Sequence, residues 1–255
     1  MLSPRIIPCL LLHKNGLYKT VQFESPKYVG DPINAVRIFN EKEVDELIFL
    51  DIDSTVLGAE PNYELIATIA SECQMPLSIG GGIKTLEQAK KINSLGVEKI
   101  LLSSAAISDS NLLTRMADVL GKQSVVAVLD VKKKKGLFSD SYEIMTHNGK
   151  NRPPLNFFDT IAHLQSQGVG EVVVNSIDKD GMMNGYDVNL AKKVKKCCEV
   201  PFTMLGGAGS LEHMRELFEN IGLVGAAAGS MFVFKGKYRA VLINYPSKEQ
   251  KQSLF

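Results

Sequence analysis

The residues best placed for chemistry in this sequence are Asp130, Asp180 and Lys19. Asp130 ends a short apolar run, and Asp180 lies in the loop after another. A carboxylate in such a position can move protons if burial raises its pKa. Lys19 lies in a glycine-bearing segment and can clamp a substrate phosphate; a solvated lysine is the alternative. We therefore predict that these residues carry acid–base catalysis on a phosphorylated substrate.

Two similar glycine clusters, Ser78–Lys84 and Met204–Ser210, predict a pair of phosphate sites. Each cluster follows an apolar run and precedes a helical pattern and a second apolar run that ends in small residues. Glycines let backbone N–H groups approach a phosphate, and a helix N-terminus adds a favourable dipole. Tight turns alone are the alternative, and the duplication favours phosphate binding. The predicted substrate- and phosphate-binding residues are Gly81, Gly82, Ser103, Ser104, Asn175, Gly207, Gly209, Gly229, Ser230 and Asp51. For Asp51, hydrogen bonding within its own loop is an equal alternative.

Charged residues also stand at the amino ends of four apolar runs: Arg5, Glu46, Lys99 and Glu171. They can simply be solvated strand starts. Alternatively, two acids and two bases on one rim can pair across a barrel axis. A cluster of ion pairs that closes the barrel end is costly to bury, and its pairs can therefore open.

An internal repeat of half the chain length predicts how these residues are positioned. Each half consists of four strand–helix units, so we predict one (β/α)8 TIM barrel over residues 1–255, with an open doubly wound sheet as the alternative. The length is typical of such a barrel, in which active sites lie at the carboxyl ends of the strands. The predicted strands are 5–12, 47–50, 77–79, 99–102, 125–129, 171–174, 202–205 and 223–227.

The segments between these strands give further expectations. A long loop follows the first strand as far as Gly30, and Asp31 with Pro32 begins a helix. Thr85 and Gln88 form a capping-box pattern. Residues 132–154 alternate like a hairpin over the barrel mouth.

Composition limits the partners and the compartment. The formal net charge is +1, so nothing favours nucleic acid or an anionic membrane. The four cysteines lack metal-ligand spacing, and we predict no metal or cofactor. The sequence has neither a signal-peptide pattern nor a long apolar run, which favours a cytoplasmic protein. The four histidines are scattered, and we interpret them as incidental.

With these residues in view, the chain resembles the cyclase subunit of imidazole-glycerol-phosphate synthase. The similarity covers nearly the whole length, and the segments that carry it, highly specific together, are 5–10, 30–32, 45–52, 80–83, 176–181, 185–187 and 206–209. The resemblance implies that a glutaminase docks on the barrel floor and that its ammonia passes along the axis. It implies that this ammonia reacts at the mouth with a bis-phosphorylated ribonucleotide. It also implies that Arg5, Glu46, Lys99 and Glu171 form the ammonia gate.

The sequence departs from the family pattern at the mouth. Leu11 stands where the family has the second catalytic carboxylate, Ser103 replaces an asparagine, and Asn175 replaces a threonine. Loss of one acid–base partner costs about 10² to 10⁴ in rate. The segment after Phe234 also differs from the usual last helix.

Three hypotheses follow from these departures. The first is that the barrel delivers ammonia from a glutaminase to a sugar-amidating enzyme, as in paralogues that amidate a nucleotide-linked sugar in surface-polysaccharide (lipopolysaccharide) biosynthesis. The second is an active cyclase (a lyase) of histidine biosynthesis. The third is a non-catalytic scaffold that activates the glutaminase. The sequence contains no Gly-x-Cys-x-Gly nucleophile, so the chain is not predicted to be a Cys-type glutaminase itself.

Overall fold

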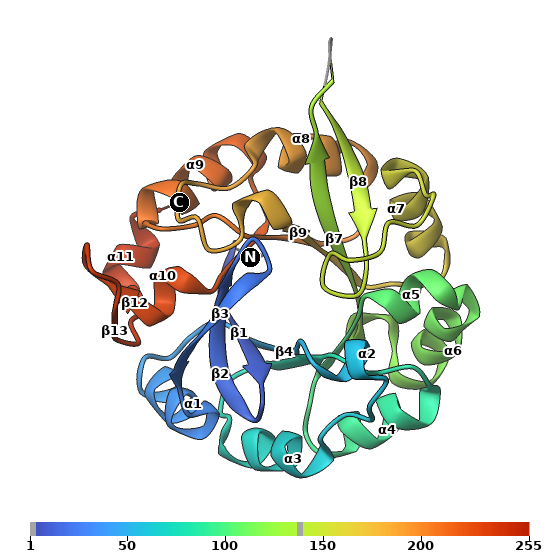
Figure 1. Cartoon of the computed structure of the whole chain (residues 1–255), viewed down its shortest axis with the longest axis horizontal. Coiled ribbons are helices and arrows are strands. Elements are labelled where there is room, and N and C mark those ends of the chain that lie inside the picture. The colour runs from blue at the N-terminus through green and yellow to red at the C-terminus, as the bar shows by residue number, and fades with distance from the viewer. Residues whose placement is uncertain (1–3, 137–139, 255) are drawn as a thin grey trace.

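The protein folds into a closed barrel of parallel strands, as predicted. The computed structural model describes residues 4–136 and 140–254. Strand β11 pairs with β1, with Arg5 opposite Gly225, and this pairing closes the barrel. Figure 1 shows the strands around a common axis with helices outside them. The barrel strands are β1 (Arg5–His13), β4 (Leu47–Asp51), β5 (Leu77–Gly80), β6 (Lys99–Leu102), β7 (Val125–Lys134), β9 (Glu171–Ser176), β10 (Phe202–Leu205) and β11 (Gly225–Ala228).

The outer helices begin at the predicted capping residues. The Asp31 side chain accepts from the Asn34 N–H with Pro32 as the first helical residue, and Thr85 and Gln88 form the capping box. The main helices are α1 (Pro32–Glu41), α3 (Tyr63–Glu72), α4 (Leu86–Ser94), α6 (Ser110–Leu120), α7 (Phe157–Ser166), α8 (Val188–Cys197) and α9 (Leu211–Ile221). Short helices α2 (Ser54–Leu57) and α5 (Ser104–Ser108) follow β4 and β6. None of the helices in the described residues is long and apolar enough to cross a membrane.

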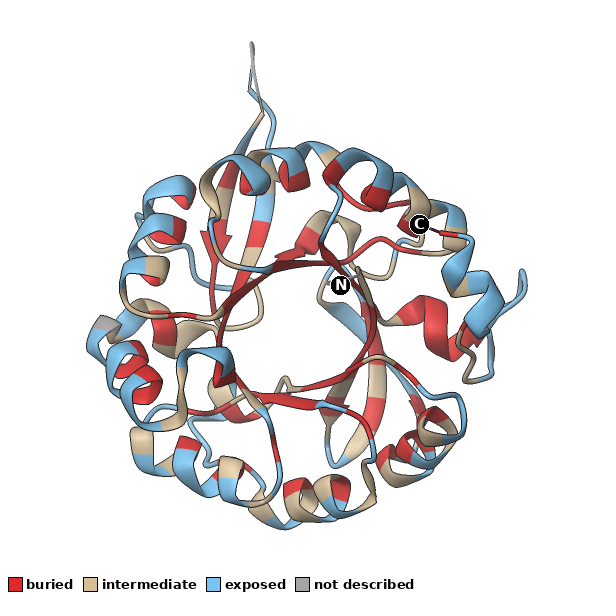
Figure 2. Cartoon of the chain, turned by 180° about the vertical axis from the view of Figure 1, so that it is seen from behind, coloured by how far each residue is buried: buried red, intermediate tan, exposed pale blue. Residues whose placement is uncertain are grey.

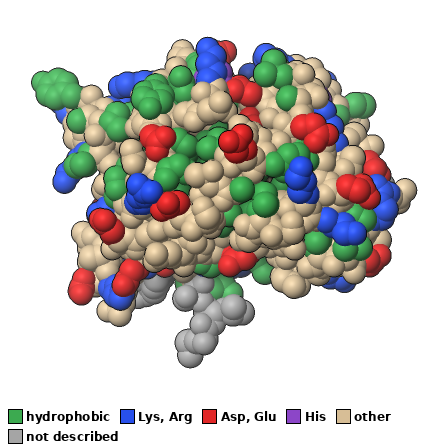
Figure 3. All heavy atoms as spheres, turned by 90° about the horizontal axis from the view of Figure 1, so that it is seen from below, with side chains coloured by type: hydrophobic (Ala, Val, Ile, Leu, Met, Phe, Trp, Pro, Cys, Tyr) green, Lys and Arg blue, Asp and Glu red, His purple; other side chains and the backbone are tan. Residues whose placement is uncertain are grey.

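The apolar side chains form two buried layers. Ile6 and Leu10 of β1 point outward into the larger cluster beneath the helices, whereas Ile7 and Cys9 belong to a smaller cluster inside the barrel. This division follows from the alternation of side chains along a strand. Figure 2 shows the result: the ring of barrel strands is mainly buried, and the helices are buried on the side facing it. On the outer surface, acidic and basic side chains are interspersed (Figure 3).

Of the two predictions about the connecting segments, one was wrong and the other is confirmed. The expected long loop before Gly30 is an antiparallel hairpin, β2 (Gly16–Val21) and β3 (Glu24–Gly30), because β1 continues to His13 and pairs with β2. This hairpin lies over the end of the barrel (Figure 1). The hairpin expected after the fifth barrel strand is present, since β7 continues to Lys134 and pairs with β8 (Ser141–Met145).

The eighth barrel helix is replaced by a composite segment. A single turn, α10 (Ser230–Val233), is followed by a two-stranded hairpin, β12 (Phe234–Lys235) and β13 (Ala240–Val241), and then by α11 (Lys248–Gln252). These elements occupy the sector between α9 and α1 in Figure 1. The difference expected after Phe234 is therefore a real change of structure.

Candidate functional site

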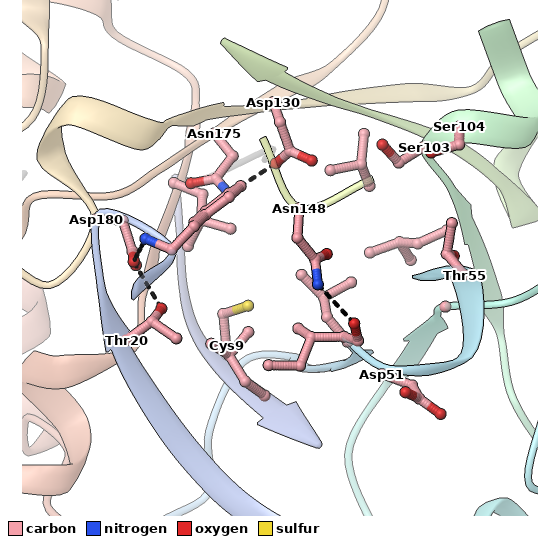
Figure 4. A pocket seen from close by; sticks show the side chains of 18 of the residues that line it. Cys9, Thr20, Asp51, Thr55, Ser103, Ser104, Asp130, Asn148, Asn175 and Asp180 are labelled. Atoms are coloured by element: carbon pink, nitrogen blue, oxygen red, sulfur yellow. Dashed lines mark hydrogen bonds between the residues drawn. The ribbon is translucent and has the colours of Figure 1, made fainter. Parts of the chain in front are cut away.

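A cavity of about 450 Å³ opens at the carboxyl ends of the barrel strands, where the sequence predicts the site. We call this cavity the mouth; Figure 4 shows its interior. The predicted residues that line it are Lys19, Asp51, Gly81, Gly82, Ser103, Ser104, Asp130, Asn175, Asp180, Gly207, Gly229 and Ser230. Gly209 is not among the lining residues: its N–H donates to Nδ1 of His213, 3.1 Å away.

Asp130 is an acid in the wall of this cavity. It lies in β7 and accepts a 2.9 Å hydrogen bond from Nδ2 of Asn175 on the neighbouring strand β9. Burial raises the pKa of Asp130 to about 6; the hydrogen bond from Asn175 opposes the shift and the charge of Asp180 adds to it. With that pKa, Asp130 can both accept and return a proton near neutral pH.

Asp180 lies across the mouth and is held by the β2–β3 hairpin. Its Oδ2 accepts from Oγ1 of Thr20 at 2.7 Å and from the N–H of Phe23 at 3.2 Å. The backbone carbonyl of Asp180 accepts from the N–H of Gln22. Burial raises the pKa of Asp180, and the Thr20 hydrogen bond opposes that rise. The β2–β3 hairpin, for which a loop was expected, therefore holds the carboxylate of Asp180 in place.

Lys19 projects from the same hairpin toward the end of β11. Its Nζ donates to the carbonyl of Cys9 at 2.5 Å, and a side chain at Gly229 would collide with it. Burial lowers the pKa of the Lys19 ammonium. The cation therefore lies beside Gly229 and Ser230, one of the predicted phosphate sites.

The two glycine clusters adopt matching backbone conformations. Gly81 and Gly82 have φ of +114° and +72°, and Gly206 and Gly207 have φ of +94° and +107°, a region that favours glycine. A Cβ on Gly207 would also collide with the carbonyl of Gly185. The N–H of Gly82 already donates to Oγ1 of Thr55, so that amide is engaged within the protein.

Asp51 contributes to the wall of the mouth mainly through its backbone and stem. Its carboxylate accepts from the N–H of Asp53 at 2.8 Å, and from the N–H and Oγ of Ser54 at 3.0 and 2.6 Å. These bonds fix the first turn of α2, so the structure supports the loop-hydrogen-bonding interpretation of this residue.

The side of the mouth formed by β1 is apolar. Leu11 lines the cavity beside Leu50 and Phe23, so no carboxylate of β1 faces Asp130. The departure noted in the sequence therefore falls inside the cavity, where it changes the available chemistry.

Sequence reasoning missed several residues of the mouth. Asn148 reaches across it and donates from Nδ2 to the carbonyl of Ile52 at 2.7 Å (Figure 4). His147, interpreted as incidental, also lines the cavity. The φ angles of His147 and Asn148, +53° and +56°, lie in the left-handed region. The Asn148-Gly149 dipeptide is a turn signal that marks this bend in the sequence, although it does not show where the bend lies in space.

The four charged residues at the other end of the barrel pair with one another, which was one of the two alternatives considered for them. We call Arg5, Glu46, Lys99 and Glu171 the floor ring. The guanidinium of Arg5 contacts Glu46 at 2.5 Å and Glu171 at 2.6 Å, and Nζ of Lys99 contacts them at 2.9 and 3.0 Å. Although burial opposes it, the charges of Arg5 and Lys99 hold the pKa of Glu171 below its usual range.

Neighbouring hydroxyls complete the ring. Oγ of Ser78 donates to Glu46 at 2.8 Å, and Oγ1 of Thr203 donates to Glu171 at 2.6 Å. A side chain at Gly225 would collide with Thr203. The carboxylates are thus satisfied from both sides, which buried charges require.

Aliphatic side chains fill the barrel between the floor ring and the mouth. This inner cluster includes Ile7, Ile48, Val126, Val173 and Ala227, each at most 2% exposed. A small molecule moving from the ring to the mouth would have to displace them. The interior is therefore a packed apolar layer, as in other barrels of this class.

Comparisons with known proteins agree with this geometry. A family model described as "Histidine biosynthesis protein" matches residues 5–239. "Putative imidazole glycerol phosphate synthase subunit HisF" of Leptospira borgpetersenii is 52% identical over 255 residues, 100% of both chains. "Putative imidazole glycerol phosphate synthase subunit hisF3" of Vibrio vulnificus is 52% identical over 252 residues, 99% of this chain and 96% of that protein. "Imidazole glycerol phosphate synthase subunit HisF" of Chlorobium limicola is 35% identical over 235 residues, 92% of each.

Proposed function

Because the chain belongs to the histidine biosynthesis protein family, we propose that it is the synthase subunit of a glutamine-dependent complex of the imidazole-glycerol-phosphate-synthase type. A glutaminase docks on the floor and supplies ammonia, which is used on a phosphorylated substrate in the mouth. One observation carries the proposal: a closed ring of ion pairs at one end of the barrel faces an acid-bearing cavity at the other, with an apolar interior between them.

The floor ring suits the control of ammonia entry. Neutral ammonia crosses an apolar layer at a much lower free-energy cost than ammonium, because burying an unpaired charge is expensive. The ring excludes water and ions while its pairs are closed, and it opens when one pair separates. The aliphatic side chains above it must then move aside for ammonia to pass to the mouth.

The mouth suits a substrate with a phosphate at each end. The repeated glycine turns lie after β5 and β10, and Lys19 lies beside the second of the two sites. Asp130 lies between them in the cavity wall and exchanges protons with the reacting centre. Asp180 is the second acid available for this exchange.

The first candidate for the substrate is the bis-phosphorylated ribonucleotide of histidine biosynthesis. The names of the relatives favour this substrate, since they describe subunits of imidazole glycerol phosphate synthase. The reaction is then cleavage and cyclisation with incorporation of ammonia, with Asp130 as the main acid–base group.

A nucleotide-linked sugar is the second candidate, and only Leu11 favours it. A leucine cannot exchange a proton, and the apolar side of the mouth keeps ammonia in its neutral form on its way out. In that case the barrel delivers ammonia to a sugar-amidating enzyme of lipopolysaccharide biosynthesis. The names of the relatives described above do not mention this acceptor.

One experiment distinguishes the two substrates. The purified chain is supplied with ammonium and the bis-phosphorylated ribonucleotide, and formation of the imidazole product is followed. We expect slow product formation that Leu11→Asp accelerates by about 10² to 10⁴, because the substitution restores a second proton-transfer group. Absence of product from both proteins would contradict the first candidate. Amidation of a nucleotide-linked sugar by the complex would then establish the second, and glutaminase activation without either product would indicate a scaffold.

A further inference from the structure

The segment that replaces the eighth helix makes a direct connection to the floor ring. After β13, residues 242–245 run back along α10: the Leu242 N–H donates to Val233 and the Asn244 N–H to Phe232, both at 2.9 Å. The rings of Phe232 and Tyr245 then pack with their centroids 5.5 Å apart. This attachment holds Tyr245 at a fixed position beside the barrel.

The hydroxyl of Tyr245 bridges two barrel segments. It donates to the carbonyl of Ile6 at 2.8 Å and accepts from the N–H of Asp45 at 3.2 Å. Ile6 follows Arg5 in β1, and Asp45 precedes Glu46 at the start of β4. A single oxygen therefore holds the backbones that carry two members of the floor ring.

The side chain of Asp45 strengthens this junction. Its Oδ2 accepts from the N–H of Ile6 at 3.0 Å, and its Oδ1 contacts Nζ of Lys251 in α11 at 2.6 Å. Burial raises the pKa of Tyr245, so its hydroxyl keeps its proton and remains a donor over the physiological pH range. The C-terminal segment thus contacts the barrel at Ile6 and Asp45, the residues next to Arg5 and Glu46 of the floor ring.

We infer that Tyr245 is a positioning residue for the ammonia gate, setting the spacing of Arg5 and Glu46 through the backbones beside them. This inference rests on the proposed function. The contact between these two side chains, at 2.5 Å, is the shortest ion pair of the ring. A charge-assisted bond of this kind weakens quickly when its atoms separate or tilt. Loss of the hydroxyl bridge therefore changes how readily the ring opens.

The test uses the complex with its glutaminase and compares two sources of ammonia. Tyr245→Phe removes only the hydroxyl and keeps the ring against Phe232. Tyr238→Phe is the control, because Tyr238 lies in the same C-terminal segment and is 91% exposed. Product is measured per glutamine hydrolysed, and separately with added ammonium, which reaches the open mouth without crossing the floor. Thermal midpoints of all proteins are recorded.

We expect Tyr245→Phe to lower product per glutamine by a few-fold to about tenfold, as the loss of a hydrogen-bonded bridge allows. The rate with added ammonium and all results for Tyr238→Phe should equal those of the wild type. Equal coupling in both variants overturns the inference alone. A parallel fall in both rates and in the midpoint also overturns it, because the role would then be structural. A wild-type complex that forms product with added ammonium but none with glutamine overturns the proposed function and the gate together.

Discussion

The buried position of Asp130 destabilises its charged form and raises its pKa to a value suited to proton transfer. The carboxylate accepts a 2.9 Å hydrogen bond from Asn175 and a further one from Ser103, and it lies in a cavity wall whose β1 side is apolar. The folded protein therefore binds a proton at this position more tightly than the unfolded chain does. That difference links the proposed acid–base role of Asp130 to the pH dependence of stability.

Asp130→Asn tests this link through the free energy of unfolding. The pKa of Asp130 is raised from 3.8 to about 6 on folding, so the native state binds more protons between these values. Stability contributed by this group is present below pH 3.8 and is lost as pH rises through 6. The asparagine variant should therefore be more stable than the wild type at pH 7, by roughly 2 to 3 kcal/mol, and equal to it near pH 4. Urea unfolding at several pH values measures this, with Asp118→Asn, at an exposed position of α6, as the control. A constant difference across the pH range would contradict the assignment.

At the scale of the element, the hairpins decide which side chains reach the mouth. The β2–β3 hairpin carries Lys19 and Thr20 over the barrel end and thereby places a cation and a hydroxyl beside β11 and Asp180. The turn of this hairpin uses Gln22 and Phe23 at φ of +53° and +66°. Because neither residue is glycine, the sequence carried little signal for the turn, and a loop was predicted there instead.

Thr20→Val should impair the second acid while leaving the hairpin intact. The Thr20 hydroxyl donates to Asp180 and lowers its pKa, so its removal should raise that pKa further and shift the acid limb of the pH–rate profile upward. The profile of product formation with ammonium measures the shift. Thr68→Val is a matched control, because Thr68 is exposed on α3 and its hydroxyl bonds only to the carbonyl of Glu64. An unchanged profile would remove Asp180 from proton transfer.

The parts of the site that follow single strands were predictable, and those that meet across the barrel were not. Apolar runs and glycine turns located Asp130 and Gly207 because each directly follows or ends an apolar run of its own strand, although β7 continues beyond Asp130 to Lys134. Asn148 meets Ile52 only after the chain has closed around the axis, and no local pattern records that contact. For Asp51, the sequence could not distinguish a site residue from a capping residue, since both need a carboxylate after a strand.

At the scale of the whole molecule, the barrel has two ends with different electrostatics. The floor ring consists of two carboxylates, 5% and 8% exposed, held by two partly exposed cations. The sequence predicted these residues on one rim, and the parallel register of the strands brings them into contact. Their pairing is observed, and their action as a gate is the proposal.

Lys99→Ala should disturb both the stability of the floor and the transfer of ammonia. The substitution leaves Glu46 and Glu171 with Arg5 as their remaining partner in the ring, and removing one partner of a buried ion pair costs about 3 to 5 kcal/mol. Urea unfolding at pH 7 measures this loss. In the complex, product per glutamine should also change relative to the wild type. Lys195→Ala, at an exposed position of α8, is the control, and equal behaviour of the two variants would argue that the ring has no role.

The duplicated glycine turns have a consequence for ligands with two identical ends. In the proposed function each of the glycine turns after β5 and β10 holds one phosphate, and their backbone conformations are similar, whereas Lys19 and Asp130 occur once each. A symmetric bisphosphate would therefore fit in either of two orientations. For an asymmetric bisphosphate, Lys19 and Asp130 would select one orientation. The structure of a complex with a symmetric bisphosphate inhibitor would then show the ligand in two overlapping orientations.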